Sequence, residues 1–478
     1  MNAQELEGEL RKAHEIIAAQ AERIAELEAK VAELLALLQH KADSKAAKKP
    51  RFPDNYSLKQ IRQKKKRHRK STGRRQNEAK RELVECRVAI YPEGAVRKRC
   101  VLQRSQCAWR IIEGRAKYVQ YDIYGLPESK EAPIPPGLRN SRSEFGIEVI
   151  LILAHLHYWV GLSIDNARET IRFFTGLVLA KSQADSLLNQ LASDWNEQYD
   201  AIAQLIALQM IVYIDETGWK IGKKSCYTWA FSTAMHVLFR CGVGRGREEA
   251  EAILGPSFAG IGVTDDYGVY THLFAEHQLC WAHLLRKAIK LALQNAQEPT
   301  YAEFLTELCA IYEQAVAFQR DQRLSAGRAD KVLELQERIR SLCGLCDIRT
   351  SDTTCEALAT FIRLQNELVD NLDCLFVFVQ HPTVEATNNR SEHNVRREAE
   401  IRKGGRTSKT SHGATRRGII MTILASLRTR FSKFTLDALI DEVARWARQG
   451  YSIFEAELKA LLNAAGTANC QPEPVPSG

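Results

Sequence analysis

Three acidic residues, far apart in the sequence, have the chemical character of a metal site. Asp215 and Asp265 each follow an apolar, β-branched run, so each is predicted to stand at the end of a buried strand. Glu392 lies in the polar stretch 385–406, which has helical spacing. Three carboxylates brought together stay ionised only with a cation among them, and such hard oxygen ligands suit Mg²⁺. Taken singly, each acid has a plainer interpretation, as a turn cap or as part of a solvated helix.

Four motifs in a fixed order carry a resemblance to a known family. They read YIDETGW (213–219), VTDDYGVY (263–270), CWAHLLRK (280–287) and TNNRSEHNVRREAEIRKG (387–404). Together they resemble the DDE transposases of bacterial insertion sequences of the IS66 type, from about residue 80 to about residue 430. The resemblance implies that Asp215, Asp265 and Glu392 are the catalytic and metal-binding triad. It also implies a ribonuclease-H-like fold. Asp266 departs from the family pattern, which more often has Gly there.

The reaction that these residues predict is Mg²⁺-dependent DNA transposition. Two ions, Mg²⁺ or Mn²⁺, about 4 Å apart would activate water or a 3′-hydroxyl and stabilise the leaving 3′-oxygen. Asp215 would bridge both ions, Asp265 would hold one and Glu392 the other. The DNA partners would be the terminal inverted repeats of the element and the target. Two alternatives stay open: a ribonuclease-H-like nuclease that never joins DNA, and a catalytically inactive coiled-coil regulator that binds DNA.

Polar residues around Glu392 are predicted to hold the DNA strand beside the scissile phosphate. They share its helical face or lie in the basic loop that follows. These residues are Asn388, Asn389, Arg396, Arg402 and Lys403.

The N-terminal region predicts self-association and DNA binding. Residues 1–40 carry heptads whose a positions are Leu10, Ile17, Ile24, Val31 and Leu38, typical of a two-stranded coiled coil. A lone amphipathic helix is the alternative. Residues 41–81 contain seventeen Lys or Arg and three acids, a net +14 within a chain of net +9, so the remainder carries −5. This basic arm is predicted to bind DNA phosphates, rather than serve as a solvated linker, through Lys64, Lys65, Lys66, Arg67, Arg69, Lys70, Arg74 and Arg75.

Composition indicates a reduced, cytoplasmic protein associated with the nucleoid. The 478 residues suffice for about three domains, with no long apolar run that would cross a membrane and no signal-peptide pattern at the start. The twelve cysteines are scattered, as is usual for free thiols. Cys280 and His283, three apart, make half a zinc site; a buried thiol beside a helix-starting His is the plainer interpretation. Accessory proteins of the same element are a further partner that the sequence leaves open.

The order of the predicted strands and helices around the three acids indicates an α/β catalytic domain with a mixed sheet and a helical insertion. Strands are expected at 209–215, 226–233, 236–241 and 259–264, with the first one central. Ser143, Ser163 and Ser182 are expected to start helices in the region before the sheet. The predicted domains are a coiled coil (1–40), the basic arm (41–81), a small Cys-containing module with a Pro-rich linker (82–137), a helical region (138–207), the catalytic domain in two parts (208–299 and 381–450), the insertion (300–380), and a C-terminal helix with a disordered tail (451–478).

Overall fold

The computed structural model describes residues 82–128, 132–324, 327–344 and 355–468. The predicted coiled coil, the basic arm and the tail beyond 468 lie outside these ranges. The described residues belong to one compact unit, Lys80–Gly478. In these ranges no helix is both long and apolar enough to cross a membrane.

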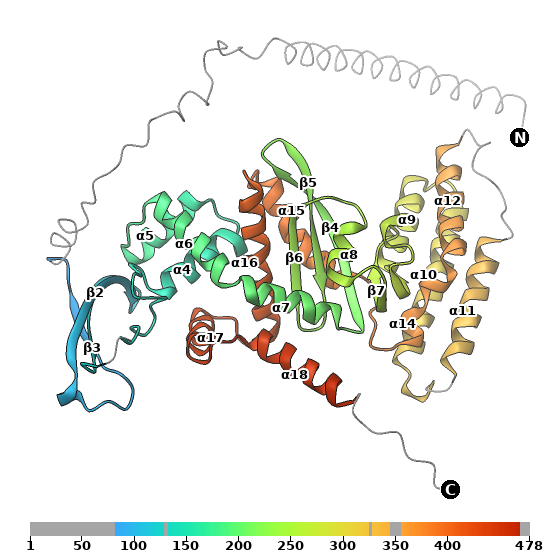
Figure 1. Cartoon of the computed structure of the whole chain (residues 1–478). Coiled ribbons are helices and arrows are strands. Elements are labelled where there is room, and N and C mark those ends of the chain that lie inside the picture. The colour runs from blue at the N-terminus through green and yellow to red at the C-terminus, as the bar shows by residue number, and fades with distance from the viewer. Residues whose placement is uncertain (1–81, 129–131, 325–326, 345–354, 469–478) are drawn as a thin grey trace, which may run out of the picture. The chain divides into compact units, whose positions relative to one another are not determined.

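A mixed five-stranded sheet forms the centre of the molecule (Figure 1). Its order is β6-β5-β4-β7-β8, so the first strand in sequence is central, as predicted. β4 pairs with β5 antiparallel and with β7 parallel. The strands are β4 (Ile211–Ile221), β5 (Lys224–Ser232), β6 (Val237–Val243), β7 (Phe258–Thr264) and β8 (Phe274–Leu279). This mixed α/β arrangement is consistent with a ribonuclease-H-like sheet.

The central strand β4 does not end at Asp215, contrary to the sequence-based prediction. It continues to Ile221, because the hairpin partner β5 supplies a full antiparallel ladder in which Asp215 pairs with Ala230. Only the other ladder stops early: β7 pairs with β4 no further than Tyr213. Asp215 therefore lies where the sheet opens on the β7 side.

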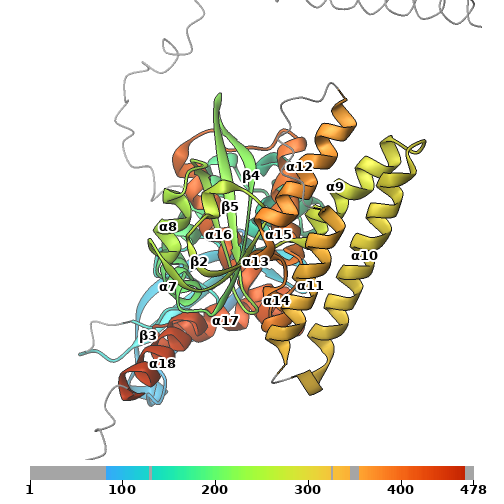
Figure 2. The same ribbon diagram turned by 90° about the vertical axis from the view of Figure 1, so that its right-hand side faces the viewer.

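Helices from distant parts of the chain cover this sheet and make two hydrophobic cores. Val212 and Ile214 belong to the larger core, whereas Tyr213 belongs to the core of the helical insertion. This split follows from the alternation of side chains along a strand. By the same alternation Asp215 points to the face of Tyr213. Figures 1 and 2 show the insertion beside the sheet; the name is used from here on to include α9, which precedes the predicted bounds of 300–380 but contributes to the same core. Its helices are α9 (Trp281–Gln294), α10 (Pro299–Arg320), α11 (Arg328–Cys343), α12 (Glu356–Asp370), α13 (Leu372–Leu375) and α14 (Val377–Gln380).

The segment before the sheet contains a small β unit followed by helices. The strands β1 (Cys86–Ile90), β2 (Val101–Ile112) and β3 (Arg115–Gly125) form a sheet of order β1-β3-β2. The helices are α4 (Ile147–Ala154), a π-helical turn (His155–Trp159), α5 (Ile164–Thr175), α6 (Lys181–Asp194) and α7 (Asn196–Ala207).

One of the three predicted helix starts is correct. Ser163 caps α5, since its Oγ accepts the Asn166 N–H at 3.0 Å. Ser143 instead closes a turn by accepting the Asn140 N–H, and α4 begins four residues later. At α6 the first turn is closed by the side chain of Gln183, which accepts the N–H of Ala180, so Ser182 is already inside the helix.

The remaining helices, apart from α8, follow the insertion. α15 (Asn389–Lys403) packs on β4 and β5, and α16 (Ser411–Arg430) packs on β6. α8 (Glu248–Leu254) lies between β6 and β7 in the sequence, and α17 (Leu436–Gln449) and α18 (Ile453–Ala468) follow α16.

A buried ion pair joins α15 to α16. The Arg417 guanidinium donates two hydrogen bonds to the Glu398 carboxylate, at 2.6 and 2.8 Å. The Glu398 side chain is fully buried and that of Arg417 is 5% exposed. Arg417 also lies 5.0 Å from the ring centre of Trp219, on β4. The pair therefore links both helices to the central strand.

We expect Glu398→Ala to lower the free energy of unfolding by about 3–5 kcal/mol, because it leaves the Arg417 charge buried without its partner. Chemical denaturation of the two proteins measures the difference. Glu337→Ala is the matched control, because Glu337 pairs with Arg340 on the surface of α11; its effect should stay within about 0.5 kcal/mol. Equal losses in the two variants would contradict the prediction.

Candidate active site

The partly buried carboxyl of Asp215 is the centre of the candidate site. The parallel register of β4 and β7 pairs Tyr213 with Val263, so two further residues along each chain bring Asp215 and Asp265 to the same level. The pKa of Asp215 is raised to about 8. Burial is the largest cause, and the charges of Glu216, Asp265 and Glu392 contribute to the rise. The Glu216 N–H, which donates to Asp215 Oδ1 at 2.8 Å, opposes this rise. Asp265 and Glu392 thus both lie within electrostatic range of Asp215.

Asp265 and Asp266 have different surroundings. The charge of Asp265 acts on Asp215. The carboxyl of Asp266 has a raised pKa because of burial and of the nearby Glu367 charge, which is itself paired with Lys287 of the insertion. Asp266 is therefore turned toward the insertion, which favours Asp265 as the partner of Asp215.

Helix α15 carries Glu392 and is held on the sheet by polar side chains. Asn388 Nδ2 donates to the Ile214 carbonyl at 2.6 Å, and Ser391 Oγ donates to the Ala230 carbonyl at 2.9 Å. Further along, Arg402 Nη1 donates to the Gly218 carbonyl at 2.7 Å. These bonds explain how so polar a sequence forms a helix that packs against a sheet: its side chains bind backbone carbonyls of β4 and β5. They also fix the position from which Glu392 extends.

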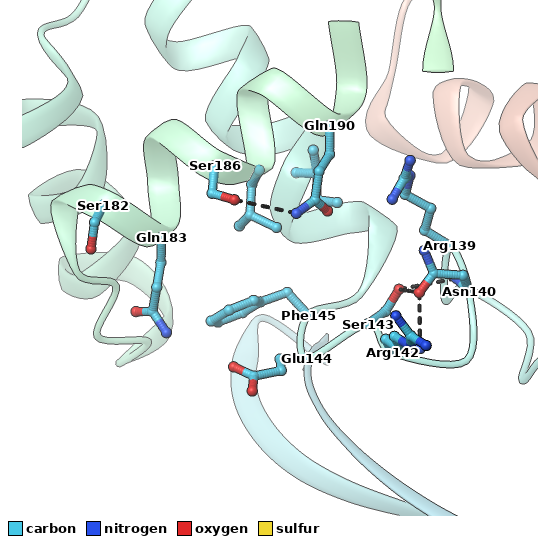
Figure 3. Close-up of a pocket in the computed structure, with 12 residues that line it drawn as sticks. Arg139, Asn140, Arg142, Ser143, Glu144, Phe145, Ser182, Gln183, Ser186 and Gln190 are labelled. Atoms are coloured by element: carbon cyan, nitrogen blue, oxygen red, sulfur yellow. Dashed lines mark hydrogen bonds between the residues drawn. The ribbon is translucent and has the colours of Figure 1, made fainter. Parts of the chain in front are cut away.

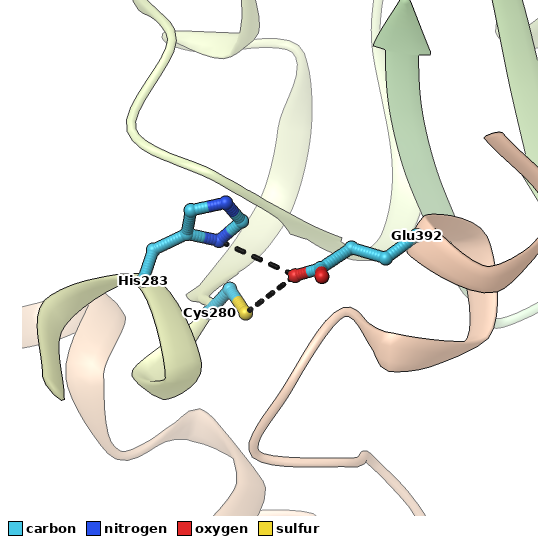
Figure 4. A group of neighbouring side chains, drawn as sticks. All are labelled: Cys280, His283 and Glu392. Carbon is cyan, nitrogen blue, oxygen red and sulfur yellow. Dashed lines mark hydrogen bonds and ion pairs between the residues drawn. The ribbon is translucent and has the colours of Figure 1, made fainter. Parts of the chain in front are cut away.

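The carboxylate of Glu392 is bound by residues of the insertion helix α9 and its N-cap. Arg286 Nη2 lies 3.1 and 3.0 Å from its two oxygens. His283 Nδ1 lies 3.5 Å and Cys280 Sγ 3.7 Å from Oε1 (Figure 4). Within the described ranges, Cys280, His283 and Glu392 form the one group of three His, Cys, Asp or Glu residues whose ligand atoms all lie within 4.8 Å of one another. The carboxylates of Asp215, Asp265 and Glu392 do not all come that close.

The residues predicted to hold DNA fall into two sets. Asn389, Arg396 and Lys403 are exposed on α15. Asn388 is 1% exposed and Arg402 is half-buried, and both bind carbonyls of β4. The first set is open to solvent, whereas the second holds the helix. The predicted residues of the basic arm, Lys64 to Arg75, lie outside the described ranges.

Two features of the site were not predicted from the sequence. Arg286, the partner of Glu392, lies within the motif CWAHLLRK, one turn after His283; that spacing is the signal that could have identified it. Glu216 is the second feature. Its side chain is 3% exposed and accepts bonds from Arg245 at 2.9 Å and from the Tyr270 hydroxyl at 2.8 Å. This places a second, compensated carboxylate directly beside Asp215.

A separate cavity lies between α6 and the loop that precedes α4 (Figure 3). Its volume is about 480 Å³, and its lining includes Arg142, Glu144 and Gln190. None of the predicted site residues that the structure describes lines it. The acids of the candidate active site therefore belong to a different part of the surface.

The site thus consists of a partly buried carboxyl on the central strand with further acids within electrostatic range. The sequence model of the transposase IS66 family matches residues 143–416, more than half of the chain. The chain belongs to this family, which confirms the resemblance seen in the motifs. It is accordingly a nucleic-acid-processing enzyme that binds DNA. Comparison with curated proteins found no match.

The raised pKa of Asp215 predicts a pH-dependent stability. Between the ordinary carboxyl value of about 4 and the folded value, the folded protein holds a proton that the unfolded chain has released. The contribution of Asp215 to the free energy of unfolding is therefore fully present at acid pH, below the ordinary carboxyl pKa. It is lost as pH rises toward about 8. In a chelating buffer, we expect the unfolding temperature to fall between about pH 5 and about pH 8, and to fall less for Asp215→Asn.

Thermal melts of the two proteins across this range measure the effect. Asp441→Asn, an exposed acid on α17, serves as the control and should keep the wild-type slope. Identical slopes for wild type and Asp215→Asn would contradict the assignment of the titration to this residue.

Proposed function

We propose that the chain is a DDE transposase with a ribonuclease-H-like catalytic domain, and that Asp215, Asp265 and Glu392 are its catalytic acids. It would cleave the ends of its element and join the 3′ ends to target DNA. One observation carries the proposal: in a chain of the transposase IS66 family, the charges of both other acids raise the pKa of the partly buried Asp215 carboxyl.

The donor set fits divalent metal ions. All three proposed ligands are carboxylates, the type that Mg²⁺ and Mn²⁺ prefer. The raised pKa of Asp215 shows how unfavourable this group of charges is without a cation, since its causes are burial and neighbouring acids. Bound ions would supply an activated water or 3′-hydroxyl and stabilise the leaving 3′-oxygen. Asp215, on the central strand, would hold these ions together with Asp265 and Glu392.

The chain's own residues position this chemistry. Asn388 and Ser391 hold α15 on β4 and β5, so Glu392 extends from a fixed helix. To hold a cation together with the aspartates, Glu392 would have to give up its contact with Arg286. Arg286, whose side chain is 54% exposed, would then be available to a DNA phosphate. The exposed Asn389, Arg396 and Lys403 lie on α15 with Glu392, and they would make further contacts along the DNA strand.

The N-terminal segments would complete the assembly. The heptads of residues 1–40 support a dimer or higher oligomer, which would bring two element ends together. The charge of residues 41–81 supports an arm that binds DNA through its phosphates. Accessory proteins of the same element would act with this assembly.

Strand cleavage and joining test the catalytic assignment. With Mg²⁺ and a labelled duplex carrying the element end, we expect Asp265→Asn and Glu392→Gln to lower cleavage by at least about a thousandfold while DNA binding persists, because each removes a metal ligand. Asp266→Asn is the matched control and should stay within about tenfold of wild type. Products are resolved on denaturing gels.

The products also separate the alternative functions. Joined strands support transposition, cleavage alone indicates a nuclease, and binding without cleavage indicates a regulator. Normal cleavage by Glu392→Gln would overturn the proposed triad.

Salt dependence tests the basic arm. We expect the slope of log affinity against log salt concentration to decrease by about 0.9 for each phosphate contact removed. Replacing Lys64, Lys65 and Lys66 by Ala should therefore change it by up to about 2.7, and Lys64→Ala alone by about a third of that. Fluorescence anisotropy at several salt concentrations measures both slopes. An unchanged slope in the triple variant would exclude these lysines from the interface.

A further inference from the structure

Cys280, His283 and Glu392 have the spacing of ligands around one metal ion. Their ligand atoms lie within 4.8 Å of one another, with Glu392 Oε1 3.5 Å from His283 Nδ1 and 3.7 Å from Cys280 Sγ. Around tetrahedral zinc, two ligand atoms lie about 3.3–3.6 Å apart. A zinc ion therefore fits among the three atoms with small movements of the side chains (Figure 4).

The protein holds two of these ligands in place through its backbone. Cys280 is the N-cap of α9 and is 1% exposed, and its Sγ accepts the Asn388 N–H at 3.1 Å. His283 lies in the first turn of the same helix. The thiol is thus anchored between β8 and α15, while its S–H points toward Glu392.

One buried atom points to a missing ligand. His283 Nδ1 is buried and, among the described residues, has no hydrogen-bond partner; its contact with Glu392, at 3.5 Å, is too long for a good bond. Buried polar atoms are usually paired, so an exception calls for an explanation. A bound cation satisfies Nδ1 and the carboxylate oxygen that faces it.

We propose that Cys280, His283 and Glu392 bind one zinc ion, and that this ion inhibits the transposase by keeping Glu392 away from Asp215 and Asp265. The inhibition rests on the proposed function, whereas the metal site does not. A thiolate with an imidazole selects zinc over Mg²⁺. Binding releases the thiol proton to solvent, and the fourth position is left for water. Arg286 keeps its contact with Oε2, which lies 3.0 Å away.

Cobalt binding tests the site without DNA or activity. Titration of the full chain with Co²⁺ should produce a thiolate-to-cobalt charge-transfer band that zinc abolishes. We expect Cys280→Ser to lose the band and His283→Ala to weaken binding by roughly tenfold or more. Cys309→Ser, on α10, is the matched control and should retain the band. Absence of the band in wild type, or its survival in Cys280→Ser, would overturn the proposal.

Zinc inhibition tests the consequence. One equivalent of zinc should suppress Mg²⁺-dependent cleavage by wild type at least about tenfold, and a chelator should restore it. The ratio of activity without and with zinc should fall toward one in Cys280→Ser. A zinc-insensitive wild type that still shows the cobalt band would overturn the inhibitory role alone. A protein that binds cobalt but never cleaves DNA would contradict the proposed function and leave the metal site standing.

Discussion

The burial of a carboxyl on the central strand is the constraint on which the rest of the site depends. Asp215 lies on β4 among acids, and its pKa is raised to about 8 by burial first and then by the neighbouring charges. A charge in such surroundings costs free energy unless a cation or hydrogen-bond donors compensate it. The adjacent Glu216 is compensated by Arg245 and Tyr270, but Asp215 receives one backbone N–H among the described hydrogen bonds. The strand therefore carries one acid with two side-chain donors and, beside it, an acid that receives a single backbone donor, as the proposed metal site would require.

The polar helix α15 meets a related constraint. A helix with so few apolar residues gains little from hydrophobic burial, so it is held by specific bonds. Asn388, Ser391 and Arg402 bind strand carbonyls, and the Glu398–Arg417 pair fixes its far end to α16. Such bonds are directional, in contrast to apolar packing. The helix thus holds Glu392 in a defined place. It depends on a buried ion pair, and loss of either partner would leave the other charge buried and uncompensated.

The sequence predicted the elements of the sheet better than the contacts between them. The apolar runs before Asp215 and Asp265 identified β4 and β7, because buried strands have a distinct composition. The extension of β4 beyond Asp215 was missed, since it depends on pairing with β5 rather than on the strand's own residues. The preference of Asp266 for the insertion and the pairing of Glu392 with Arg286 were missed for the same reason. Both are contacts across 100 residues or more, and no local pattern encodes which of two adjacent acids turns which way.

Glu392 belongs to two sets of neighbours, and the chemistry of each set decides which cation it can share. On one side are the carboxylates of Asp215 and Asp265, which are hard ligands suited to Mg²⁺. On the other side are a thiol, an imidazole and a guanidinium, all from the segment that starts α9. The guanidinium of Arg286 pairs with Glu392, with Nη2 3.0 Å from Oε2. The side chain of Glu392 thus lies between the aspartates proposed as catalytic and the first turn of α9. Under the two proposals, the cation that binds first would determine which of the two sets Glu392 completes.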